Sequence, residues 1–193
     1  RNIFVVFTYI YSSLINVEIM SMKKAYHGSP ALFDHFEMGG AGDGTGIRFG
    51  YGVYLTDVEE SAVHYSQPRK LDFTDKHYLY TVEIPELVEG EYLVSAKPVN
   101  EKIVEKVEEK MRVKVPADIK AKGLEFRKWI GRTLTGIQDP ATDEEKKAVE
   151  MKAAEFLESV GVHYNVWPNA QTVPDGPKNY AVFDPSRVKI VKV

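Results

Sequence analysis

The sequence contains no cysteine among its 193 residues. This absence excludes disulfide bonds, thiolate metal sites and a cysteine nucleophile, and it leaves the redox compartment open. Long apolar runs are scarce as well. The longest, residues 3–15, is short for a membrane-spanning helix, which needs about twenty apolar residues, and it lacks the lysine-rich start and the cleavage site of a signal peptide. We therefore expect no membrane association.

A strong excess of charge of one sign is also missing. The net charge is −3, which gives no global argument for binding nucleic acid or a membrane surface. The hydrophobic content of 44% and the charged content of 27% are typical of a soluble globular protein. The length suits one domain with a real core. Residues 1–22 differ in composition and are interpreted as an N-terminal extension of uncertain origin, which leaves residues 23–193 as the domain.

Several familiar catalytic motifs are absent. The five histidines include no H-E-x-x-H pair, so we expect no metal. There is no G-x-S-x-G of a serine hydrolase. Five glycines crowd residues 39–46, but they lead toward a second strand, expected over residues 47–55, and not directly into a helix. This order does not fit a Rossmann fingerprint, and we interpret the glycines as a mobile loop.

The hydrophobic pattern predicts an α+β fold. Strands are expected at residues 23–27, 47–55, 78–84, 92–94, 162–167, 179–183 and 188–193. Between them, from about residue 99 to 160, apolar residues recur with helical spacing and predict three helices. A capping box at Thr142 and Glu145 begins the third of these helices. Strands, an inserted helical block and further strands favour α+β over alternating α/β.

A second capping box, Thr56-Asp57-Val58-Glu59, predicts a helix directly after the strand that carries Tyr54. Ser61 and Tyr65 are four residues apart on that helix, and they therefore share one face. This spacing brings Tyr54, Ser61 and Tyr65 within reach of one small pocket. His27, which ends the first strand, is the remaining polar candidate. Each of these residues alone has an ordinary structural explanation, but together they suit a flat heteroaromatic amide.

The motifs carry a resemblance to a known family. Tyr26-His27-Gly28-Ser29 and Phe49-Gly50-Tyr51-Gly52-Val53-Tyr54-Leu55-Thr56-Asp57, followed by Ser61 and Tyr65, resemble the NAD-binding core of diphtheria-toxin-type ADP-ribosyltransferases. The poly(ADP-ribose) polymerase branch is the most similar. The ending Asn179-Tyr180-Ala181-Val182-Phe183-Asp184-Pro185 is similar to the last core strand of that superfamily, in particular to compact transferase domains of phage and bacterial toxins.

The resemblance covers residues 23–193 and implies a split β-sheet core with the helical block inserted. It also implies NAD as a co-substrate. His27 is then expected to bind a ribose hydroxyl, and the backbone of Gly28 together with the Ser61 side chain is expected to hold the nicotinamide amide. Tyr54 and Tyr65 are expected to stack on the nicotinamide ring, and Ser29 belongs to the same binding motif. The implied reaction breaks the nicotinamide–ribose bond and transfers ADP-ribose.

One position departs from the family pattern. The polymerase branch has a glutamate directly before the last core strand, where this sequence has Asn179. A neutral amide hydrogen-bonds but does not accept the ribose proton. We therefore expect mono-ADP-ribosylation and not polymer synthesis, with His27, Tyr54 and Asn179 as the catalytic set. Two alternatives stay open: an acid supplied by Asp175, and a catalytically silent module that only binds NAD or ADP-ribose.

The resemblance implies a macromolecular acceptor, either protein or nucleic acid. It also implies a bacterial or phage toxin or effector that works in the cytoplasm of the producing or target cell, with an antitoxin or immunity protein as a possible partner. A basic run over residues 112–132 favours a nucleic-acid surface as a separate hypothesis, although such runs are usually solvated faces.

Overall fold

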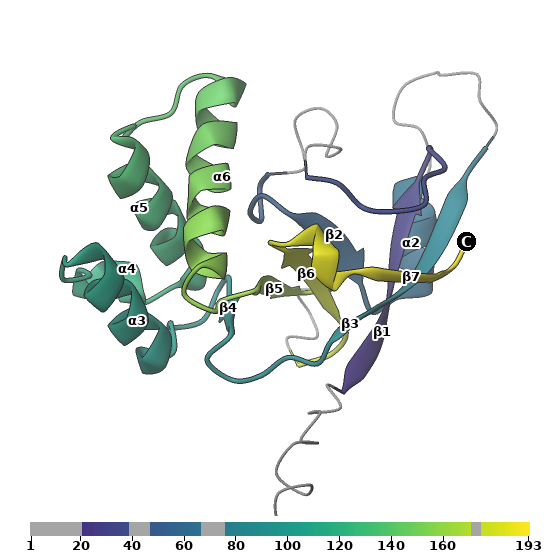
Figure 1. Cartoon of the computed structure of the whole chain (residues 1–193), viewed down its shortest axis with the longest axis horizontal. Coiled ribbons are helices and arrows are strands. Elements are labelled where there is room, and N and C mark those ends of the chain that lie inside the picture. Colours follow the sequence, from purple (N-terminus) through teal and green to yellow (C-terminus); the bar gives the residue numbers. More distant parts are fainter. Residues whose placement is uncertain (1–20, 39–46, 67–75, 171–174) are drawn as a thin grey trace, which may run out of the picture.

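The computed structural model describes residues 21–38, 47–66, 76–170 and 175–193. Within these residues, seven strands form one sheet in the order β4-β5-β6-β2-β1-β3-β7 (Figure 1). Their bounds are β1 Met22–Ser29, β2 Val53–Thr56, β3 Tyr78–Pro85, β4 Tyr92–Val94, β5 Tyr164–Pro168, β6 Lys178–Val182 and β7 Lys189–Lys192. Only β4 and β5 pair in parallel; the other neighbours are antiparallel. The prediction of an α+β fold is confirmed.

Alternation along the strands explains how the sheet buries one of its faces. In β3 the side chains of Tyr80, Val82 and Ile84 are fully buried, and in β6 Tyr180 and Val182 are buried on the same face. The residues between them point to the opposite face, because successive side chains of a strand alternate. Phe33 and Phe36, from the segment after β1, pack against the buried face as aromatic cover. We call the buried side the core face and the other side the site face.

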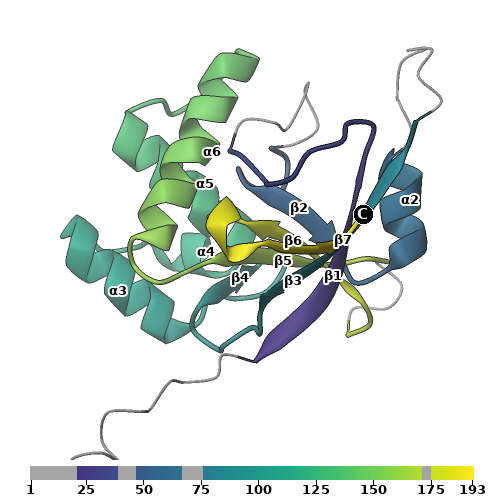
Figure 2. The same cartoon turned by 45° about the vertical axis from the view of Figure 1, so that its right-hand side comes forward.

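Four helices lie between β4 and β5 and fall within the expected range 99–160: α3 Glu101–Met111, α4 Ala117–Lys120, α5 Gly123–Thr135 and α6 Asp143–Glu158. They gather at the β4–β5 end of the sheet (Figures 1 and 2). Their apolar stripes form a second core with Leu93 and Phe183 of the sheet region. The capping box of α6 is confirmed, since Thr142 Oγ1 accepts from the Glu145 N–H and the Glu145 carboxylate accepts from the Thr142 N–H. The single-turn helix α4 was not predicted.

The helix that carries Ser61 is α2, Glu59–Ser66, and it packs beside β1 at the other end of the sheet (Figure 2). It follows β2 as predicted, but the predicted capping box at its start is wrong. Thr56 is the last residue of β2, and its Oγ1 accepts from the Val58 N–H at 3.2 Å. In the sequence, Pro68 predicts the end of this helix, and that position lies outside the described residues.

The strand predicted over residues 47–55 is shorter than expected. Ile47 to Gly50 form a turn in which the Gly50 N–H donates to the Ile47 oxygen at 3.1 Å. Gly50 has φ of +112°, a conformation that few residues other than glycine adopt. The strand therefore begins at Val53. The glycines at 39–46 and the proposed extension, apart from Ser21 and Met22, lie outside the described residues. No helix in the described part of the chain is long and apolar enough to cross a membrane.

Candidate functional site

The side-chain amide of Asn169 joins residues from three elements on the site face. Asn169 lies just after β5, and its Nδ2 is 3.1 Å from Thr56 Oγ1 at the end of β2 and 3.1 Å from Ser61 Oγ on α2. The same Nδ2 is 3.0 Å from Asn179 Oδ1 on β6. The Asn169 backbone N–H donates to the Pro177 oxygen at 2.8 Å, and this bond holds the backbone from which the side-chain amide projects. We call these four residues the amide cluster.

The amide cluster has more acceptor oxygens around the Asn169 amide nitrogen than that nitrogen has hydrogens. A carboxamide nitrogen carries two hydrogens, and here it faces three acceptor oxygens. Ser61 Oγ can in turn donate to Asn169 Oδ1 at 3.4 Å, a long bond. All four side chains are neutral. The cluster therefore has spare hydrogen-bonding capacity that suits an amide or a hydroxyl.

Tyr54 lies on the same sheet face as the amide cluster, because β2 pairs with β6 so that Tyr54 opposes Ala181 and Thr56 opposes Asn179. Its hydroxyl donates to the Gly50 oxygen at 2.8 Å and accepts from the Phe49 N–H at 3.2 Å. Its ring meets Trp167 edge to face at 5.7 Å, and Phe49 stacks on Trp167 at 4.2 Å. Burial raises the pKa of the Tyr54 hydroxyl, so it stays protonated and acts as a fixed link to the turn before β2.

The sheet is held together weakly between β1 and β2. The two strands share one register pair, Tyr26 with Thr56, whereas β1 pairs with β3 from Met22 to Ser29. His27 bridges the two strands beyond that pair, with Nδ1 2.7 Å from the Tyr54 backbone oxygen. Because a carbonyl oxygen only accepts, Nδ1 carries the hydrogen.

His27 itself points to the core face. Its ring packs against Phe36 at 5.1 Å and against Phe33 and Tyr80 at 6.0 Å each. Burial of the ring lowers the pKa of His27, although the hydrogen bond to Tyr54 opposes this shift. The imidazole is therefore neutral at pH 7. The structure connects His27 to the backbone of Tyr54, but it places the ring on the opposite face from Ser61 and Asn179.

Gly28 is the point where α2 approaches the sheet. A Cβ at this position would lie 1.8 Å from the Ala62 oxygen and 2.7 Å from the Ser66 nitrogen of α2. Only glycine allows the helix, and with it Ser61, to lie so close to β1. Ser29, the next residue, is buried, and its Oγ accepts from the Ala31 N–H at 3.1 Å. Tyr65 is 56% exposed on the outer side of α2, with its ring edge against His64.

Asp175 does not join the amide cluster. Its carboxylate is exposed and lies 3.5 Å from the Lys97 ammonium group in a surface ion pair. This position gives no support to Asp175 as a substitute acid. Among the described residues no group of three or more histidine or acidic side chains could hold a metal ion.

The basic run over residues 112–132 does not form one face. Arg127 is fully buried and paired with Glu150, with Nε 2.6 Å from Oε2. Lys114 and Lys120 both face the carboxylate of Glu108. Lys128 and Arg132 instead line a cavity beside α6. These residues therefore lie in different surroundings, and the nucleic-acid hypothesis for this segment stays a prediction.

No known family model, curated protein or solved structure matches this chain. The geometry of the site therefore carries the functional argument.

Two contributors to the site were missed by sequence reasoning. Asn169, the centre of the amide cluster, is a single asparagine between β5 and β6, and no motif distinguishes it. Trp167 contacts both Tyr54 and Phe49, and it lies on β5 opposite Asn179, a register that the sequence pattern does not reveal. Strand pairing was needed to connect either residue with Tyr54.

Proposed function

We propose that this protein is an NAD-dependent mono-ADP-ribosyltransferase that transfers ADP-ribose to a protein or nucleic-acid acceptor. The observation that carries the proposal is the hydrogen bonding of Ser61 and Asn179 to the same carboxamide, that of Asn169. These two residues come from motifs at opposite ends of the resemblance to diphtheria-toxin-type transferases. The chain folds so that both reach one amide, and nicotinamide carries the same functional group.

Two further features support the proposal. The seven strands form one sheet, and the junction of β1 with β2, which has a single register pair close to Gly28 and Tyr54, is where the split of that superfamily would fall in this proposal. The aromatic rings of Tyr54 and Trp167 lie on the same face as Asn179, where a flat ring could stack. In this proposal nicotinamide takes the place of the Asn169 amide at Ser61, and the ribose lies toward Asn179.

The roles that follow are limited to what these side chains can do. Ser61 orients the nicotinamide amide, and the rings hold the leaving group in the geometry that breaks its bond to ribose. Asn179 can hydrogen-bond a ribose hydroxyl, but it offers no negative charge to the developing cation. A slow transfer of one ADP-ribose unit to each acceptor site fits this arrangement. A toxin or effector role, an antitoxin partner and a cytoplasmic site of action belong to the same proposal.

A second candidate function is supported by the neutrality of the amide cluster. Thr56, Ser61, Asn169 and Asn179 include no acid, and Asp175 is engaged elsewhere. A site of this composition suits a module that binds NAD or ADP-ribose without cleaving it.

One experiment separates the two functions. Purified protein is incubated with NAD labelled in the adenosine half and with separate protein and nucleic-acid fractions of a lysate, and both released nicotinamide and transferred label are measured. Transfer that is lost in Ser61→Ala and Tyr54→Ala but kept in the control Ser186→Ala, an exposed serine away from the cluster, supports the transferase. Calorimetric NAD binding without nicotinamide release supports the binding module, and absence of both contradicts the proposal.

A further inference from the structure

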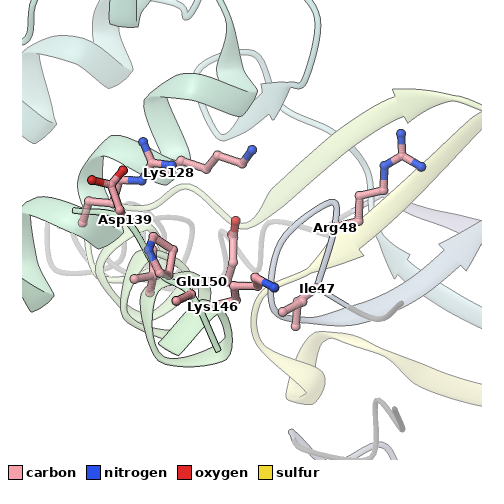
Figure 3. Close-up of a pocket in the computed structure, with 10 residues that line it drawn as sticks. Ile47, Arg48, Lys128, Asp139, Lys146 and Glu150 are labelled. Carbon is pink, nitrogen blue, oxygen red and sulfur yellow. The ribbon is translucent and has the colours of Figure 1, made fainter. Parts of the chain in front are cut away.

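A cavity of about 590 Å³ lies between the turn before β2 and the helices α5 and α6. Figure 3 shows Ile47 and Arg48 on one side of it, Lys128 and Asp139 on the other, and Lys146 and Glu150 between them. Arg132 completes the polar lining from α5. The volume falls in the range of small-molecule sites. None of the residues predicted to bind NAD lines this cavity.

The lining is cationic although the protein as a whole is acidic. Four cationic residues and two acidic residues line the cavity: Arg48, Lys128, Arg132 and Lys146, and Asp139 and Glu150. Glu150 is already neutralised by the buried Arg127, whose Nε and Nη2 lie 2.6 and 3.3 Å from its two oxygens. Lys146 has one additional acidic neighbour, Asp143 at 3.1 Å on the exposed side of α6. Positive charges therefore outnumber negative ones, even with Asp139 and Asp143 included.

Among the described residues, two arginine nitrogens, one of them on the cavity-lining Arg132, lack hydrogen-bond acceptors. Within the described part of the chain, the buried Nε of Arg132 has no hydrogen-bond partner, and neither has Nη1 of Arg127 behind Glu150. Buried donors without an acceptor are costly and uncommon in native proteins. An anion with several oxygens would add acceptors for the arginine groups that line the cavity, those of Arg48 and Arg132.

We propose that this cavity binds a phosphate ester, presented either by a mononucleotide or by the backbone of a nucleic acid. Arginine forks fit the oxygens of a phosphate in pairs, and lysines add point charges. Two arginines and two lysines from the loop and from both helices provide this combination around one space. Asp139 disfavours a ligand that is anionic over its whole surface and favours one with a neutral or hydrogen-bonding part next to its phosphate.

The cavity wall is physically connected to the candidate NAD site. The Arg48 backbone oxygen accepts from Arg127 Nη2 at 3.3 Å, and two residues later the Gly50 oxygen accepts from the Tyr54 hydroxyl at 2.8 Å. A phosphate bound at Arg48 would therefore sit on the same short turn that Tyr54 holds. The inference concerns binding and does not depend on NAD cleavage.

The test compares two probes, adenosine 5′-monophosphate and a single-stranded twelve-nucleotide DNA, by calorimetry and fluorescence anisotropy at several salt concentrations. The variant Arg48→Ala/Lys128→Ala removes one cation from each side of the cavity. Lys152→Ala is the matched control, because Lys152 lies on α6 but is exposed and, among the described residues, pairs with Glu155 and not with a residue of the cavity. Thermal unfolding verifies that each variant is folded.

At least a tenfold loss of affinity for either probe in the double variant, with no change in Lys152→Ala, is the expected result. Loss for the monophosphate alone identifies a mononucleotide site. Loss for the DNA with a reduced salt dependence identifies a nucleic-acid site. If both probes bind equally in all variants, they bind elsewhere, for example at the amide cluster, and the proposal is overturned. It is also overturned if neither probe binds. NAD turnover is measured in the same variants, so that failure of this site and failure of the proposed transferase are distinguished.

Discussion

The Nδ1 of His27 donates to the backbone oxygen of Tyr54 across the point where β1 and β2 separate, with the two atoms 2.7 Å apart. This bond joins the two strands that share only the pair of Tyr26 and Thr56. The ring that makes it is packed among aromatic side chains of the core face. His27 is thus a structural link between the strands, whatever it contributes to NAD.

The first prediction concerns the pH dependence of stability through His27. Burial lowers the pKa of the folded imidazole below its ordinary value near 6.5, so the unfolded chain binds the proton first as the pH falls. His27 should therefore make its full contribution to the free energy of unfolding above pH 6.5. Between pH 6.5 and the pKa of the folded state, this contribution should decrease by at most about 1.4 kcal/mol for each pH unit. Urea unfolding of the protein and of His27→Asn between pH 4.5 and 8 measures the difference. Parallel curves for the two proteins would contradict the prediction.

The second prediction concerns the missing acid. Asn179→Glu should raise NAD turnover by about a hundredfold, because a carboxylate can take the ribose proton and offset positive charge. Asn179→Gln introduces a side chain as long as that of glutamate but without its charge, and it should not raise turnover. Both side chains keep an oxygen that can accept from Asn169 Nδ2, as Asn179 does at 3.0 Å. Equal rates in the two variants would mean that charge at this position does not limit the reaction.

The third prediction concerns Asn169. Its amide engages Ser61, so an incoming nicotinamide amide has to displace it. Asn169→Ala should bind nicotinamide about three- to tenfold more tightly, which corresponds to about 1 kcal/mol for the hydrogen bond that is released. The same variant should unfold at a temperature lower by about 2–4 °C, since Thr56 and Asn179 lose a partner. Calorimetry with nicotinamide and thermal unfolding measure the two effects; weaker nicotinamide binding would show that Asn169 is part of the amide site.

The fourth prediction concerns the contact between α2 and β1. Gly28→Ala should lower the free energy of unfolding by about 2–3 kcal/mol, because its Cβ would overlap the Ala62 oxygen. Gly136→Ala is the comparison, since open space surrounds Gly136 and only its φ of +76° opposes a side chain. It should lose about 1 kcal/mol. Chemical denaturation ranks the two variants, and an equal loss would argue against close packing at Gly28.

The fifth prediction concerns the buried pair of Arg127 and Glu150. Arg127→Met should cost about 3–5 kcal/mol because it leaves a buried carboxylate without its partner. The double variant Arg127→Met/Glu150→Leu should recover much of this loss, since two apolar side chains replace two charges. A double-mutant cycle by urea unfolding measures the coupling. Additive losses would show that the two charges do not depend on each other.

The strands were largely predictable, because alternation is a local property. Tyr80, Val82 and Ile84 alternate in the sequence and are buried together in β3. The start of β2 was not predictable in this way, since the positive φ of Gly50 turns the chain although its neighbours favour a strand. The false capping box at Thr56 has a similar origin. Its hydroxyl interacts with Asn169, which is 113 residues away, and with Val58.

The sequence identified several residues of the candidate site, but it did not predict how they are arranged. Ser61 and Asn179 are identified by motif, and they do meet at one amide. The side of the sheet that His27 faces depends on strand register and on the aromatic cover from Phe33 and Phe36, and neither is written in the motif. The unexpected cation-lined cavity likewise needs α5, α6 and the turn before β2 to be placed against one another.

The parallel pairing of β4 with β5 has an evolutionary consequence. The helical block leaves the sheet at Val94 and returns at Tyr164, on two neighbouring strands that run in the same direction. Such a connection is a crossover, whose length can change while the strands keep their register. The helices that line the cavity could therefore be exchanged or enlarged between lineages while Tyr54, Ser61 and Asn179 stay in place. Under the proposed function, the protein could then acquire a new acceptor without a change in the residues proposed to bind NAD.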